Sequence, residues 1–140
     1  MTKPKLALIG AGVLVAVFAA GWLFGASGRS AAEHARDTVE LQLELESARA
    51  GLLAARVALY NVNFGDASRL MEQAKPALLR ARDRLNASNR TAHAGSVDAA
   101  VRAVEDAQRM AGALDQGANT RLAEAIDALA TVPAPSPATE

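Results

Sequence analysis

An uncharged run at residues 6–26, LALIGAGVLVAVFAAGWLFGA, constrains this chain more than any other feature of its sequence. A helix needs about 20 apolar residues to cross the roughly 30 Å of hydrocarbon in a bilayer, and this run has that length. Trp22 lies near its end, where an indole can reach the headgroup level. A cleaved signal peptide has a shorter apolar region, of about 7–15 residues. The run therefore predicts an uncleaved signal anchor that crosses the membrane once.

The orientation of this span depends on the positive charges beside it. Lys3 and Lys5 precede the run, and arginines at 29, 36 and 49 follow it, so the two sides are nearly balanced. We favour a cytoplasmic N-terminus because the tail at 1–5 is short and carries two lysines. This orientation predicts a single-pass protein of the plasma (inner) membrane whose C-terminal domain is extracytoplasmic, in the periplasm where the cell has one.

The composition favours helices and excludes several kinds of function. Alanine, the residue with the best helix propensity, is abundant. The formal net charge is zero, which argues against a nucleic-acid-binding protein, because such domains carry a basic excess. The chain has no cysteine, so disulfides, thiolate zinc sites, iron–sulfur clusters and thiol catalysis are excluded.

Two apolar stripes at helical spacing follow the membrane segment, in a stretch without proline. Steps of four and three alternate along the first, as they do in packed helices and coiled coils. The first stripe consists of Leu41, Leu45, Ala48, Leu52, Ala55, Leu59 and Val62. The second consists of Val39, Leu43, Ala50, Leu53, Val57, Tyr60 and Phe64. An apolar surface this wide predicts that more than one helix covers it.

Helical spacing predicts three further helices after this one. Gly65 is expected to end the first helix as a left-handed C-cap, and Asp66 to cap the second. A polar loop over 86–95 is expected to lead into a third helix capped by Ser96. Gly117 is expected to end that helix, and a short fourth helix follows.

The predicted fold class is therefore all-α, with one transmembrane helix and a small bundle of three to four helices. The bundle would combine a long helical hairpin with a helix pair. The proline-rich C-terminal segment is expected to be disordered. The predicted domains are a short tail at 1–5, the transmembrane helix at 6–26, the bundle at 30–130 and the disordered tail at 131–140.

Charge supports the hairpin. Glutamates at 40, 44 and 46 lie well before the predicted turn, and arginines at 80, 82 and 84 lie about as far after it. Folding back at the turn would bring the acidic stretch beside the basic one. Exposed ion pairs contribute only about 0–1 kcal/mol each, so these pairs would fix register more than stability.

The residues around the turn resemble half of a tetratricopeptide repeat. In that family an aromatic, a spacer, an acidic residue and an alanine open the second helix, followed by a large apolar residue and another alanine. The matching residues here are Phe64, Gly65, Asp66, Ala67, Met71 and Ala74. The resemblance implies a packed helix pair and, in the family, peptide binding in a concave groove. The preceding helix lacks the family's Trp, Leu-Gly and Tyr pattern, and no second copy follows at about 34 residues.

The sequence shows no constellation of catalytic or metal-binding residues. His34 and His93 are the two histidines, and neither lies in the Glu-x-x-His pairs of a di-iron bundle or in a triad context. No phosphate-binding glycine loop is present. We therefore expect no enzyme activity, no cofactor, no metal and no small-molecule substrate.

The sequence favours a membrane-tethered helical scaffold or protein-interaction module that binds a protein partner or self-associates. Its predicted interaction residues are Val39, Leu43, Arg80, Arg82 and Arg84. Val39 and Leu43 precede the part of the first helix that its hairpin would cover, and the arginines form the one basic cluster. The alternative is an extracytoplasmic ligand-sensing helical bundle that acts as an accessory to a membrane complex.

Overall fold

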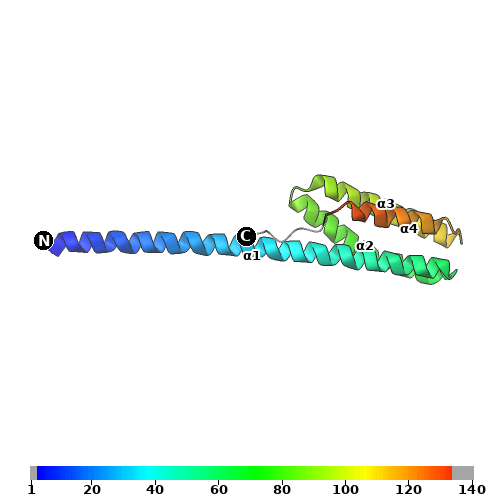
Figure 1. Ribbon diagram of the computed structural model, residues 1–140, viewed down its shortest axis with the longest axis horizontal. Helices are drawn as coiled ribbons and strands as arrows, with labels where there is room; N and C mark the ends of the chain where they lie inside the picture. The colour runs from blue at the N-terminus through cyan, green and yellow to red at the C-terminus, as the bar shows by residue number, and fades with distance from the viewer. Residues whose placement is uncertain (1–2, 134–140) are drawn as a thin grey trace. The chain divides into compact units, whose positions relative to one another are not determined.

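The computed structural model describes the backbone of residues 3–133 and the side chains of residues 32–133. Over these residues the protein is all-α, which confirms the predicted class (Figure 1). The helices are α1 (Lys3–Tyr60), α2 (Phe64–Ala87), α3 (Thr91–Gly112) and α4 (Ala118–Ala130). The chain divides after Arg36 into two compact units, and the second contains the core.

The predicted membrane segment at 6–26 lies outside the residues whose side chains are described. Among the described residues, no helix is both long enough and apolar enough to span a bilayer. Most of the predicted C-terminal tail, 134–140, also lies outside the described residues. Val132 is buried against the core, so the packed unit extends slightly beyond the predicted boundary at residue 130.

The core is built on one face of α1, which we call the inner stripe. It comprises Leu41, Leu45, Ala48, Leu52, Ala55 and Leu59, all buried. The facing residues of α2 are also buried: Ala67, Met71, Ala74, Leu78, Ala81 and Leu85. Both faces were predicted from their spacing. Val62 is the exception in the first predicted stripe, because it lies in the turn beyond the helix and is exposed.

Small residues allow α1 and α2 to approach closely. A Cβ atom added at Gly51 would lie 3.2 Å from the Cβ of Ala74 on α2. This distance is shorter than ordinary van der Waals contact. The absence of a side chain at Gly51 therefore allows the two helices to approach closely at this point. Such close packing makes the interface sensitive to added volume.

α3 and α4 complete a four-helix bundle. α2 packs on α3, and α3 packs on α4. α4 also contacts α1. Arg49 on α1 donates a hydrogen bond to the carbonyl oxygen of Leu129 at 2.5 Å. Near the other end of α4, Arg56 donates from Nε to Asn119 Oδ1 at 2.9 Å. The four helices therefore surround one continuous core.

Each of the three turns has one residue in the left-handed region: Val62, Asn89 and Leu114, with φ of 59°, 58° and 58°. In the first turn Asn63 N donates to the carbonyl of Ala58, and Val62 N donates to that of Leu59. This pair of bonds is the Schellman motif, which satisfies carbonyls at a helix C-terminus. The other two turns repeat it.

This geometry corrects the predicted first turn. Gly65 is not left-handed and lies inside α2. The cap of α2 is Asn63, whose side chain accepts from the backbone N–H of Asp66, so Asp66 is not the cap. The sequence signal misled because glycine usually occupies the left-handed position, and here valine occupies it.

Two later boundaries were also wrong. The predicted loop at 86–95 is only three residues long, 88–90, because α3 begins at Thr91. Ser96 therefore lies inside α3, where Ala94 before it is already buried in the core. α3 ends at Gly112, and Gly117 precedes α4 as its N-cap. Alanine-rich sequence extends α2 to Ala87 and lets α3 begin at Thr91, across polar residues that resembled a loop, whereas α3 ends before the predicted Gly117.

Substitutions at two adjacent leucines compare the stability that the inner and outer faces of α1 contribute. Leu52 is 0% exposed and Leu53 is 49% exposed. We expect Leu52→Ala to lower the free energy of unfolding by about 2–5 kcal/mol, because it leaves a cavity in the core. Leu53→Ala should change it by about 0.5 kcal/mol. Urea unfolding of residues 32–140, followed by circular dichroism, measures both, and equal effects would mean that the inner stripe is not the core.

The left-handed positions in the first two turns, Val62 and Asn89, offer a second matched pair of substitutions. A β-branched residue is strained at positive φ, whereas asparagine tolerates it. Val62→Asn should therefore raise the free energy of unfolding by about 1 kcal/mol, and Asn89→Val should lower it by about 1–2 kcal/mol. The same denaturation assay measures both changes. Opposite signs are the expected result, and two destabilised variants would contradict the assignment of Val62.

Candidate interaction surface

A second apolar face of α1, which we call the outer stripe, is exposed. It comprises Val39, Leu43, Ala50, Leu53, Val57 and Tyr60. Val39 and Leu43, two predicted interaction residues, are 64% and 68% exposed. Buried leucines on the inner stripe and exposed leucines on the outer one therefore belong to the same helix.

The helices that pack on α1 leave the outer stripe uncovered. α2 and α4 both contact α1, but neither buries the outer stripe. Phe64, assigned to the second stripe from its spacing, starts α2 and packs partly against the core. The outer stripe is uncovered because the turn after Tyr60 folds α2 back onto the opposite face.

Exposed large apolar side chains are concentrated on α1 within residues 32–133. α2, α3 and α4 expose none in that part of the chain. The exceptions beyond α1 are Val62 and Leu114, which occupy left-handed positions in two turns. Within these residues α1 is thus apolar on two faces, whereas the large apolar side chains of α2, α3 and α4 are at least half-buried.

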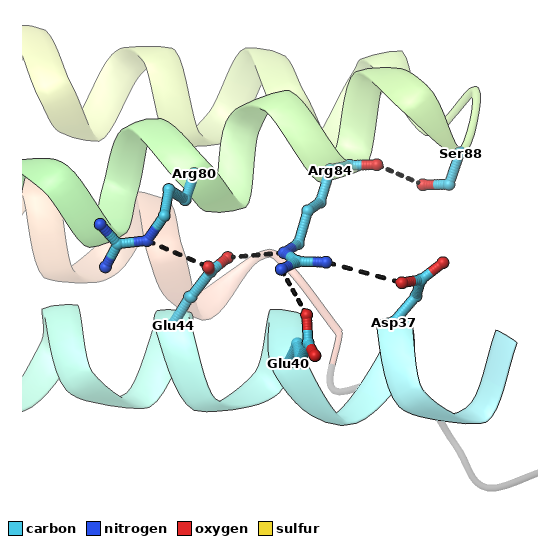
Figure 2. Close-up of polar contacts among 6 residues, drawn as sticks. All are labelled: Asp37, Glu40, Glu44, Arg80, Arg84 and Ser88. Carbon is cyan, nitrogen blue, oxygen red and sulfur yellow. Dashed lines mark hydrogen bonds and ion pairs between the residues drawn. The ribbon is translucent and has the colours of Figure 1, made fainter. Parts of the chain in front are cut away.

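An ion-pair network joins α1 to α2 beside the inner stripe (Figure 2). Glu44 accepts from Nε of Arg80 at 3.1 Å and from Nε of Arg84 at 3.2 Å. Arg84 also reaches Glu40 at 2.5 Å and Asp37 at 3.6 Å. The network brings together the acidic and basic stretches that the sequence placed on either side of the turn.

The three arginines predicted to bind a partner all form ion pairs within the chain. Arg80 and Arg84 face α1, so both guanidinium groups are paired within the chain. Arg82 pairs with Asp83 at 2.8 Å and approaches Asp98 of α3 at 3.6 Å. The hydrogen bond that Arg82 donates to Asp83, then the charge of Asp83, raises the pKa of Arg82 above its ordinary value. The cluster therefore fixes helix register, and its role in binding a partner stays a prediction.

On the other side of α1, polar contacts tie the outer stripe's border to α4. Arg56 donates a hydrogen bond to Asn119, and both side chains also interact with Tyr60. The hydrogen bond with Asn119, followed by the hydrogen bond and charge of Arg56, lowers the pKa of the Tyr60 phenol. Sequence reasoning missed this cluster because residues far apart in the chain give no local spacing signal.

The described side chains include neither a metal-ligand cluster nor a buried ionisable group. No group of three or more metal-ligating residues occurs among them, and none of the buried residues at 32–133 is polar or charged. His34 is exposed at the start of this part of α1, and His93 is half-buried in the first turn of α3. The two histidines therefore lie on separate helices.

Comparison with protein-family models, with curated proteins and with solved structures finds no match for this chain. The helical hairpin of α1 and α2 is present, but its tetratricopeptide resemblance stays a prediction. The outer stripe and the ion-pair network are therefore interpreted from their own physical chemistry.

The ion-pair network can be tested with two glutamates on α1. The Glu44 side chain is 12% exposed and accepts from two arginines, whereas Glu46 is 58% exposed and pairs only with Arg49. Glu44→Ala should lower the free energy of unfolding by about 1–3 kcal/mol, because it removes two charge-assisted hydrogen bonds. Glu46→Ala should change it by at most about 0.5 kcal/mol. Urea unfolding measures the difference, and similar values would mean that the network does not stabilise the hairpin.

Proposed function

We propose that this protein is a membrane-tethered helical scaffold, a protein-interaction module that carries out no reaction itself. The observation that carries the proposal is the exposed outer stripe of α1. Its large side chains remain in water although the same helix buries a full inner stripe. Contiguous exposed apolar surface usually marks a contact site, because leaving it in water is unfavourable.

The tether in this proposal is the uncharged run at 6–26. Its length suits a single crossing of the bilayer. Two lysines in the short preceding tail favour a cytoplasmic N-terminus. The proposed location is the plasma (inner) membrane, with the helical bundle on the extracytoplasmic side.

Alkaline carbonate extraction tests the tether. The full-length chain should remain in the membrane pellet, because carbonate releases proteins held only by surface contacts. A version beginning at residue 32 provides the control and should leave the pellet. Recovery of the full-length chain in the supernatant would contradict the tether.

Charge substitution tests the interaction surface. Leu43 and Leu114 are 68% and 69% exposed, and only Leu43 belongs to the outer stripe. Leu43→Glu should reduce the size of the complex extracted from membranes in mild detergent, because a carboxylate cannot be buried cheaply at an apolar contact. Leu114→Glu adds the same charge elsewhere and should leave the size unchanged. An unchanged complex in both variants, measured by sedimentation, would contradict the proposed surface.

A further inference from the structure

The outer stripe has the repeat of a two-stranded coiled coil. Its members are three, four or seven residues apart, and Glu46 occupies the position skipped between Leu43 and Ala50. Alternating steps of three and four average 3.5 residues, which keeps one seam facing a partner helix along a left-handed supercoil. At about 1.5 Å per residue the seam is roughly 30 Å long. The surface therefore fits a helix.

Among the described residues, only α1 presents an uncovered face of this kind. The large apolar side chains of α2, α3 and α4 are buried or half-buried within residues 64–130. A helix with the same repeat and the same length is thus available from this chain itself, as the outer stripe of another copy.

Charges at the border of the stripe are paired within the chain. On the side of α4, Arg49 and Arg56 bind Leu129 and Asn119. On the side of α2, Glu40 binds Arg84. Glu46, the charged member of the repeat, lies 2.6 Å from Arg49. The two glutamates and two arginines at this border therefore carry no net charge together. Such a surface suits a partner whose border also carries no net charge, as that of a second copy does.

We propose that the outer stripe binds the outer stripe of a second copy of this chain, as a parallel two-stranded coiled coil. This inference rests on the tether proposed above. Anchoring two chains by the same end in one bilayer favours parallel pairing and raises their effective concentration. Each apolar residue then meets its own counterpart across the seam. Glu46 meets Glu46 in a single polar layer, which specifies register at a cost in affinity.

Disulfide trapping in native membranes tests this pairing with the full-length chain. The chain has no cysteine, so one substitution gives one thiol. Leu53→Cys should form a covalent dimer on mild oxidation, because counterparts at the seam come within disulfide range. Leu114→Cys is more exposed to oxidant but lies in a turn outside the outer stripe, so it should remain monomeric. Absence of a dimer from Leu53→Cys would overturn the proposal.

Two further variants test the orientation and the polar layer. Chains with Leu43→Cys and chains with Leu53→Cys, differently tagged and coexpressed, should not join to each other. A disulfide between the two kinds of chain would overturn the parallel alignment. Glu46→Leu should raise the association constant about tenfold, because it removes a like-charge contact. Weaker association would overturn the proposal and indicate a cationic partner.

Failure of this inference can be told apart from failure of the proposed function. If Leu43→Glu shrinks the extracted complex but Leu53→Cys gives no dimer, a different protein covers the stripe and the self-pairing is overturned alone. If Leu43→Glu leaves the complex unchanged and Leu53→Cys gives no dimer, the interaction surface and the self-pairing fall together.

Discussion

Burial of the inner stripe of α1 is the contact on which the rest of the bundle depends. α2 packs along it, with Ala74 close to Gly51, and α4 returns to its other border through Arg49 and Arg56. α3 packs on both α2 and α4. Because α2 and α4 both pack on this side of α1, the outer stripe remains exposed.

Polar contacts and apolar burial favour the same side of α1. Both stripes are apolar, so the hydrophobic effect alone favours burying either. The carboxylates of Glu40 and Glu44 project toward α2 and bind Arg84 and Arg80 (Figure 2). Packing α2 on the outer stripe would separate these groups and place Leu52 in water. Apolar burial and the ion pairs thus both favour the inner stripe.

Much of the bundle was predictable from periodicity, because core positions such as Leu52, Leu78 and Val104 recur at helical spacing. Turns were less predictable, since their left-handed residues include Val62 and Leu114 instead of glycine. The exposed state of the outer stripe was not predictable either. Its spacing is close to that of the inner stripe, and the glutamates at 40 and 44 show only which side of α1 faces α2.

Thiol labelling in intact membranes tests most directly whether the outer stripe is covered in the working protein. A membrane-impermeant maleimide should label a cysteine introduced at position 57 slowly in membranes and rapidly after detergent dissociation. A cysteine at position 114 should be labelled rapidly in both. Equally rapid labelling of both positions in intact membranes would show a bare outer stripe and would contradict the account.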